Sequence, residues 1–581
     1  MVAYVKIIED IRFSEIKCSQ AFVVNNCRKI SLNQIDIDNT LKSSQLSRFQ
    51  NSNLKERGFS YPRKSNSSGG LESPPSVSFE SSQGSFEITS TIKSAKVGRV
   101  LRNAPPDGSE NRPYPEYGNK QKKEKTDMSE TREIKAGFVG FGEVNTPKEF
   151  IVKRCADAAK SLEKAGLELS VTAPVSDDPQ GREAVRAVNE LAKNDFDLLI
   201  ICVAGWIPSW AVFSVIEPFK HKPMILWGLS GWQEGDRFVT TADQAGTTAL
   251  RKPMEDMGYN FKYLVNYRGG KPGIAEIVNY AEAARAASLL KTARIGMSGY
   301  RDMRLYGTLY DGVSLKAQIG PEIEHFDLLE IAQLMEKVDA KEIGTVAAAL
   351  KKRWKFVKEP QPGTVENSVR LFLALKAKIR ERKYQGFSFC DVDGVKKLMK
   401  FAPAGSLTLL HDEMDVSSVP ENDSLGAVTQ LIVRYLTGQV AAYLEFYEFM
   451  KDGALMGVPD YVPAEIVDGE VTVMPNAFGD FGEGLLNVSK LKTGKVTICR
   501  LGYSKGEYAM HIVTGTARTP IKWEEAGWAP PAPQLPSLEI IFDSPVEDFI
   551  QKVMSQHYII SYGDNRAKLE ALCSILGIRS C

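Results

Sequence analysis

The sequence contains few cysteines and no excess of charge of either sign. Its eight cysteines are spread over 581 residues, and no two of them form a C-x-x-C pair. So low a density is typical of free thiols in a reducing compartment and argues against a disulfide framework, and zinc-finger ligand spacing is also missing. The 73 lysines and arginines nearly balance the 72 aspartates and glutamates. The overall charge therefore gives no reason to expect nucleic acid or an anionic membrane as a partner.

A membrane-spanning helix and a secretory signal are not expected either. Residues 198–216, LLIICVAGWIPSWAVFSVI, carry no charge, but Gly205 and Pro208 interrupt them. We interpret the first part as a buried strand and the second part as a capped helix of an α/β domain. The first residues, MVAYVKIIEDIRF, include acidic side chains and no clean apolar region. We therefore expect a cytoplasmic protein.

Residues 1–127 are predicted to be a disordered, low-complexity extension. They include NSNLKERGFSYPRKSNSSGG, which is rich in Ser, Asn and Gly, and they end in the charged run NKQKKEKTD. Such a segment cannot bury enough apolar surface to offset the chain entropy lost on folding. Met128 follows directly and is an alternative start of the protein.

Residues 128–581 are predicted to form two Rossmann-like, doubly wound α/β domains followed by a smaller β domain. Strand patterns alternate with amphipathic helix patterns, which is typical of parallel βαβ units. We assign residues 128–290 to an N-terminal α/β domain and residues 291–450 to a central α/β domain. Segments such as EIVDGEVTVMPN alternate with a period of two, so residues 451–581 are expected to form an antiparallel, barrel-like domain.

The stretch VPENDSLG, residues 419–426, places two carboxylates directly before a helix pattern. Asn422, Asp423 or Ser424 suits the helix N-terminus, where short polar side chains cap free amides and the helix dipole favours a negative charge. Glu421 lies before the cap, at a strand end, where side chains often face the active-site crevice of an α/β domain. Capping therefore explains Asp423 better than it explains Glu421.

Two further side chains complete a candidate metal site. Glu445 lies in the apolar strand QVAAYLEFYEF, and a buried carboxylate needs a charged partner, a metal or a proton. An exposed edge strand that carries Glu445 and Glu448 explains the same pattern equally well. His557, in SQHYIISYGD, is one of five histidines. Two glutamates and one histidine would suit a divalent ion such as Mn²⁺, Mg²⁺ or Zn²⁺.

Three segments resemble the L-fucose isomerase family and, more distantly, the arabinose isomerases. They are ENDSLGAVTQLIVRYLTG with the following AAYLEF, IGMSGYRDMRLYGTLYDGVSLKAQIGPEIEHFDLLEI, and QHYIISYG. The segments occur in the order found in the family, and ENDSLGAV is the most specific of them. The resemblance covers the chain from about residue 130 to its end, and it implies an enzyme that interconverts an aldose and its ketose with Mn²⁺ or another divalent cation.

The resemblance also implies roles for individual residues. Glu421 and Glu445 would bind the metal and transfer a proton between C1 and C2 of the sugar through an enediol. His557 would be the third metal ligand, and Met303 would contact the substrate. Members of the family more often have Asp where this chain has Glu445, and they are commonly hexamers. We therefore expect a homo-oligomer that acts on a monosaccharide.

Two other functions remain compatible with the sequence. Gly137, Gly140 and Gly142 in GFVGFGEV follow a strand, as in the dinucleotide-binding turn of an NAD-dependent oxidoreductase. Asn145, however, stands where the third glycine of G-x-G-x-x-G belongs. A non-catalytic, two-lobed sugar-binding protein would also have two α/β domains, although it needs no metal ligands and usually has a signal peptide.

Overall fold

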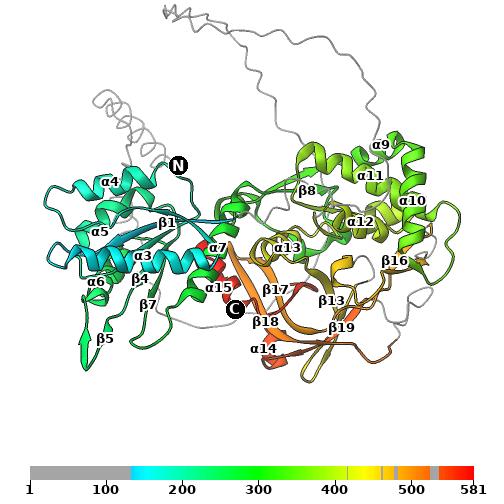
Figure 1. The fold of residues 1–581 in the computed structure, drawn as a ribbon. Helices are drawn as coiled ribbons and strands as arrows, with labels where there is room; N and C mark the ends of the chain where they lie inside the picture. The colour runs from blue at the N-terminus through cyan, green and yellow to red at the C-terminus, as the bar shows by residue number, and fades with distance from the viewer. Residues whose placement is uncertain (1–132, 415, 459–461, 477–481, 524–535) are drawn as a thin grey trace, which may run out of the picture. The chain divides into compact units, whose positions relative to one another are not determined.

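The computed structural model, drawn in Figure 1, combines two parallel sheets flanked by helices with a closed antiparallel β-barrel. The predicted extension, residues 1–127, lies outside the described residues. The structure describes residues 133–414, 416–458, 462–476, 482–523 and 536–581.

The first sheet is parallel and doubly wound, as predicted for the N-terminal α/β domain. Its order is β2-β1-β3-β4-β7. The strands are β1 (Ile134–Phe141), β2 (Leu167–Val171), β3 (Leu198–Val203), β4 (Met224–Gly228) and β7 (Phe261–Val265). The helices are α3 (Lys148–Lys164), α4 (Arg182–Leu191), α5 (Ser209–Ile216), α6 (Asp243–Asp256) and α7 (Ile274–Thr292). A short hairpin of β5 (Trp232–Glu234) and β6 (Arg237–Val239) follows β4.

The uncharged segment at residues 198–216 folds as predicted, into β3, a loop and α5. Every residue of β3 is buried, because the strand lies inside the sheet between β1 and β4. Among the described residues, no helix is both long enough and apolar enough to span a bilayer.

The second sheet has the same winding with four strands. Its order is β12-β11-β8-β9, and all neighbours are parallel. The strands are β8 (Arg294–Ser298), β9 (Glu322–Phe326), β11 (Gly386–Phe389) and β12 (Ser417–Val419). The helices are α8 (Gly312–Gln318), α9 (Leu328–Lys337), α10 (Ala340–Arg353), α11 (Thr364–Arg382), the π-helix η4 (Asp391–Met399), α12 (Ala404–Met414) and α13 (Ser424–Thr437). The order reverses between β8 and β11, which is where open α/β sheets bind ligands at the carboxyl ends of their strands.

A closed barrel of six antiparallel strands follows, in agreement with the predicted barrel-like domain. β17 (Gly494–Ser504) pairs with both β20 (His557–Tyr562) and β18 (Glu507–Arg518). The pairings β20–β13, β13–β14, β14–β19 and β19–β18 complete the ring. β13 is Ala442–Met450, β14 is Gly453–Gly457 and β19 is Ser537–Phe542. Closure removes the open edges at which a sheet could pair with another chain.

Shorter elements accompany these three assemblies. A small mixed sheet joins β10 (Lys355–Phe356), β15 (Thr472–Asn476) and β16 (Gly484–Asn487). Near the barrel lie α14 (Val546–Ile550), α15 (Arg566–Leu576) and β21 (Arg579–Ser580), and β21 pairs in parallel with β18. Single 3-10 turns are η1 (Glu217–Phe219), η2 (Asp302–Arg304), η3 (Tyr306–Thr308) and η5 (Ala464–Ile466).

Strand β13, which bears Glu445, belongs to the barrel by its hydrogen bonds. The sequence pattern assigned residues 291–450 to the central α/β domain, and that range ends with this strand. In the structure β13 pairs with β14 and β20, which both follow it in the chain. The difference has a physical reason. An apolar run indicates that a strand is buried, but the sheet that the strand joins depends on partners distant in sequence.

Helix α13 packs against both the second sheet and the barrel. It contacts β11 and β12 of the sheet and β17 and β20 of the barrel. Apolar side chains on several sides of the helix are buried, among them Leu425, Val428 and Ile432, as expected for a helix that is covered from two directions. Because α13 begins at Ser424, the VPENDSLG stretch lies at the border between the parallel sheet and the barrel.

The barrel buries a histidine that makes stability dependent on pH. His511 on β18 is buried, and its Nδ1 lies 2.8 Å from the Tyr558 hydroxyl. Burial, with the charges of Lys552 and Arg566, lowers the pKa of His511 to about 4. Between that value and pH ~6.5 the unfolded chain binds a proton that the folded protein does not. Stability therefore falls as the pH is lowered through this window.

We expect His511 to account for a loss of about 2 kcal/mol in the free energy of unfolding between pH 7 and pH 5. His511→Gln, which cannot titrate, should show a correspondingly smaller loss. Urea unfolding of the wild type and the variant at both pH values measures this difference. Equal losses in the two proteins would contradict the prediction.

Candidate active site

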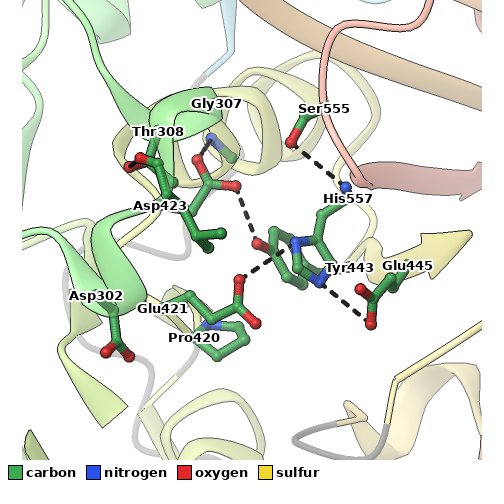
Figure 2. A network of polar contacts seen from close by, with 12 residues as sticks. Asp302, Gly307, Thr308, Pro420, Glu421, Asp423, Tyr443, Glu445, Ser555 and His557 are labelled. Atoms are coloured by element: carbon green, nitrogen blue, oxygen red, sulfur yellow. Dashed lines mark hydrogen bonds and ion pairs between the residues drawn. The ribbon is translucent and has the colours of Figure 1, made fainter. Parts of the chain in front are cut away.

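The three predicted metal ligands come from two parts of the fold and lie close together. Glu421 follows β12 at the carboxyl edge of the second sheet, which is the edge at which such sheets bind ligands. Glu445 and His557 come from the neighbouring barrel strands β13 and β20. Figure 2 shows the three side chains turned toward one another.

The His557 imidazole lies between the two glutamates. Its Nδ1 is 3.5 Å from Glu421 Oε2, and its Nε2 is 3.9 Å from Glu445 Oε2. The side chains of His557 and Glu421 are 2% and 9% exposed, whereas that of Glu445 is 32% exposed. Glu421 is therefore the enclosed carboxylate of the pair, and Glu445 is the more accessible one.

The pairing of β13 with β20 explains why Glu445 faces His557. The two residues are direct partners in the antiparallel register, and such partners on one face have Cβ atoms about 4.5–5.5 Å apart. The alternative of an edge strand is wrong, because β13 has a hydrogen-bonded partner on each side. The expected burial of Glu445 is met only in part, because its side chain reaches solvent. Glu448, further along the same strand, is exposed.

Tyr443 supports the His557 ring from one face. The two rings stack with their centroids 4.4 Å apart and an interplanar angle of 22°. The tyrosine is buried, and its hydroxyl donates a hydrogen bond of 2.9 Å to Asp423 Oδ2. Burial and the negative charges of Asp423 and Glu421 raise the pKa of Tyr443 well above its usual value. The hydroxyl therefore remains a hydrogen-bond donor, and the imidazole plane is held by stacking.

Asp423 caps helix α13, as predicted, and also forms a buried ion pair. Its Oδ1 accepts a hydrogen bond of 3.0 Å from Gly426 N. Arg500 on β17 binds both carboxylate oxygens, at 2.5 Å from Nη1 to Oδ2 and 2.8 Å from Nη2 to Oδ1. Burial alone would raise the pKa of Asp423, but the charge and hydrogen bonds of Arg500 outweigh burial and lower it. The ion pair therefore ties the start of α13 to the barrel.

Glu421 and Asn422 have left-handed backbone conformations, with φ angles of 62° and 50°. This region costs energy for residues other than glycine. The Asn422 side chain helps to hold it, because its Nδ2 donates hydrogen bonds to Ser298 O at 3.3 Å and Tyr300 O at 2.8 Å. Such conformations persist where the surrounding structure enforces them, and they are concentrated at functional sites.

Two buried aspartates beside Glu421 were not identified from the sequence. Asp391 follows β11, and its Oδ1 accepts a hydrogen bond of 2.6 Å from Glu421 N, while its Oδ2 lies 3.1 Å from Lys396 Nζ. Burial raises the pKa of Asp391, and the charge of Lys396 opposes that rise. Asp302 follows β8 and accepts hydrogen bonds from two backbone amides at the start of η4. Their positions just after buried parallel strands are the signal that could have identified them.

Met303, the predicted substrate-contacting residue, borders this edge of the second sheet. It lies in η2 after β8, and its N–H donates hydrogen bonds of 3.0 Å to Asp302 Oδ1 and to Asp393 Oδ2. Its φ of 45° is again left-handed, and the residue is 36% exposed. The structure thus brings Met303 to the sheet edge where Glu421 lies, and its contact with a substrate stays a prediction.

The donor set suits a divalent cation, although its side chains do not converge on one point. Two carboxylates and an imidazole are ligands that Mn²⁺ and similar ions accept. Glu421 contacts Nδ1 of His557 and Glu445 contacts Nε2, so the carboxylates approach opposite nitrogens. Within the described ranges, no three His, Cys, Asp or Glu side chains are arranged to hold a metal as they stand. A shared ion would require one of the three side chains to rotate.

The glycines of the possible dinucleotide-binding turn have a packing role. A Cβ on Gly140 would lie 2.3 Å from Cys155 Sγ, and one on Gly142 would lie 2.4 Å from Ile151 Cδ1. Both neighbours belong to α3, so this helix approaches β1 closely only because these positions lack side chains. A Cβ on Gly137 would lie 3.0 Å from Leu199 Cδ1. Close packing is sufficient to explain these glycines.

No protein-family model matches the chain, and no match was found among curated proteins. The resemblance to L-fucose isomerases therefore depends on the sequence segments quoted above. The proximity of Glu421, Glu445 and His557 is an independent structural observation that is compatible with it.

Removal of Arg500 should leave a buried carboxylate without its charged partner. We expect Arg500→Met to lower the free energy of unfolding by about 3–5 kcal/mol. The double variant with Asp423→Asn should recover part of this loss, because a neutral asparagine can still cap the helix. Urea unfolding followed by tryptophan fluorescence measures each value.

Lys252→Ala is the matched control, since it removes an exposed ion pair with Asp256. Exposed pairs contribute little to stability, so this variant should unfold at nearly the wild-type urea concentration. Equal losses in Arg500→Met and Lys252→Ala would contradict the importance of the buried pair.

Proposed function

We propose that the protein is a metal-dependent aldose–ketose isomerase that acts on a monosaccharide through an enediol, as the resemblance to L-fucose isomerases implies. The observation that carries the proposal is the proximity of Glu421, Glu445 and His557 at the ligand-binding edge of a doubly wound sheet. These residues are distant in sequence. Two carboxylates beside an imidazole supply the ligands and the proton-transfer groups that such a reaction requires.

Glu421, Glu445 and His557 would hold Mn²⁺ or another divalent cation. Such an ion, when bound, supplies positive charge that orients neighbouring sugar oxygens and stabilises the negative charge that develops on them. The stacking of Tyr443 on His557 would keep the imidazole in one plane. The ion pair of Asp423 with Arg500 would keep Glu421 close to the barrel.

The two glutamates would move the protons of the reaction, each in a different role. Isomerisation removes a carbon-bound proton next to the carbonyl and returns a proton to the neighbouring carbon, so a carboxylate must reach both carbons. Glu421 is the better candidate for this step, because its enclosed side chain would retain the proton instead of exchanging it with water. Glu445 is more exposed and would exchange protons between the sugar hydroxyls and solvent.

The proposal includes a cytoplasmic location, which the cysteine usage favours. The resemblance adds a homo-oligomer, with a hexamer as the state common in the family. An NAD-dependent oxidoreductase has less support, because the GFVGFGEV glycines are explained by packing. A non-catalytic sugar-binding protein would have no need for an enclosed glutamate beside a histidine.

The decisive test is the conversion of aldoses to ketoses by the full-length protein. We expect turnover of at least one sugar from a panel of pentoses, hexoses and deoxy sugars with Mn²⁺, and none after chelation. Glu421→Gln should lower kcat by at least about 10²-fold, the contribution of a positioned general base. NMR of the sugars after removal of the ion measures the conversion.

Glu448→Gln is the matched control for this test, because Glu448 is an exposed glutamate on the strand that carries Glu445. It should retain wild-type turnover. Turnover that survives chelation or Glu421→Gln would refute the assigned site, and the absence of turnover with every sugar would count against the proposed activity.

Metal affinity can be measured without turnover. We expect isothermal titration of the metal-free protein with Mn²⁺ to show one site per chain. His557→Gln and Glu445→Gln should each weaken binding by at least about tenfold, because even residues that only orient metal ligands contribute 10–100-fold. Glu448→Gln should bind as the wild type does. Binding that is unchanged in both ligand variants would show that the ion, if bound, lies elsewhere.

A further inference from the structure

Asp391 is a buried carboxylate that contacts the backbone of Glu421. It is the first residue of the π-helix η4, is separated from the carboxyl end of β11 by Cys390, and is completely buried. Its two oxygens have separate partners. Oδ1 accepts a hydrogen bond of 2.6 Å from Glu421 N, and Oδ2 lies 3.1 Å from Lys396 Nζ. π-Helices are rare, and they occur frequently at functional sites.

The hydrogen bond from Glu421 N to Asp391 lies where the backbone is strained. Glu421 has a φ of 62°, and the next residue, Asn422, has a φ of 50°. A non-glycine residue adopts such a conformation only where its surroundings compensate for the cost. A short hydrogen bond from Glu421 N to a carboxylate is a charge-assisted one, which is roughly twice as strong as a bond between neutral groups. Asn422 N contributes a second backbone hydrogen bond, of 3.0 Å, to Phe389 O.

Asp302, which follows β8, holds the backbone next to Asp391 in place. Asp302 is completely buried, and it accepts hydrogen bonds from Val392 N at 2.7 Å and Asp393 N at 2.8 Å. Asp393 Oδ2 in turn accepts a hydrogen bond from Met303 N. The ends of β8, β11 and β12 are therefore linked through side-chain to backbone hydrogen bonds. Figure 2 shows Asp302 on the sheet side of Glu421, opposite His557.

We propose that Asp391 is a positioning residue, whose Oδ1 fixes the left-handed backbone at Glu421 and so directs the Glu421 carboxylate toward His557. This inference rests on the proposed function for its catalytic consequence, but not for its structural content. Lys396 supplies the positive charge that allows Asp391 to be buried as a carboxylate. A displacement of about 1 Å in a reacting group can cost 10²-fold in rate, so the hydrogen bond is expected to matter for turnover.

A plainer role for Asp391 is to stabilise η4 through its ion pair with Lys396, without any effect on Glu421. The two roles use different oxygens and are separable by substitution. Asp391→Asn retains an oxygen acceptor for Glu421 N and loses the ion pair, whereas Asp391→Ala loses both. Asp243→Asn is a matched control, because it also removes a buried carboxylate from an ion pair. Asp243 of α6 pairs with Arg154 of α3, beside the first sheet.

Hydrogen exchange measured by mass spectrometry tests the positioning directly. In Asp391→Ala, exchange in a peptide that covers residues 419–424 should be at least tenfold faster than in the wild type. In Asp391→Asn it should stay within about threefold of the wild type, even if the melting temperature falls. Asp243→Asn should leave this peptide unchanged. Unchanged exchange in Asp391→Ala, or equal acceleration in all three variants, would overturn the proposal.

Kinetics on the full-length protein test the catalytic consequence. Asp391→Ala should lower kcat by about 10²-fold with little change in KM, and Asp391→Asn should recover at least tenfold of that loss. Equal kcat values in an active wild type and in Asp391→Ala would overturn the role of Asp391 in turnover. An inactive wild type that binds no Mn²⁺ would instead refute the proposed function, and hydrogen exchange alone would then decide whether Asp391 positions Glu421.

A second pair of variants is used if Asp391→Ala does not fold. Asp391→Asn and Lys396→Met both lose the ion pair and both retain the oxygen that accepts from Glu421 N. Faster exchange of the 419–424 peptide in both variants would overturn the proposal.

Discussion

A buried ion pair between Asp423 and Arg500 underlies the arrangement of the candidate site. Its side chains come from the start of α13 and from β17, and neither is more than 1% exposed. Removal of either side chain would leave the other as a buried, unpaired charge, which costs several kcal/mol of stability. The pair holds the segment before α13, which includes Glu421, against the barrel that carries His557. The distance between Glu421 and His557 thus depends on a contact that neither residue makes.

The same aspartate connects the ion pair to the imidazole. Tyr443 donates a hydrogen bond to Asp423 and stacks on His557, so the helix cap, the ion pair and the ring orientation form one network. Buried polar networks of this kind are rigid when their members are paired. On the other side, Asp391 connects the backbone of Glu421 to the end of β11. Glu421 therefore lies between a network from the barrel and a network from the parallel sheet, and both constrain its backbone.

Much of the fold could be predicted from local patterns. The alternation of strands and helices and the interrupted apolar segment at residues 198–216 are confirmed, and so is a barrel after residue 450. The segment EIVDGEVTVMPN, however, supplies β15 of the small mixed sheet and not a barrel strand. The cap at Asp423 is also confirmed, because capping depends on residues within one helical turn. Asp391 and Asp302 could not be assigned a role in this way. Asp391 binds Glu421 N, 30 residues away along the chain, and Asp302 binds Val392 N, 90 residues away. A single aspartate after a strand is a common feature.

The sequence by itself determined the local conformations, the buried faces of each element and the supply of acidic and histidine side chains. Only the tertiary structure decided that Glu421, Glu445 and His557 lie together and that β13 joins the barrel. The reason is physical: hydrophobic periodicity specifies which face of a strand is buried, while packing over the whole chain selects the partner and the register. A shift of one residue between β13 and β20 would turn Glu445 to the opposite face of the barrel wall, away from His557.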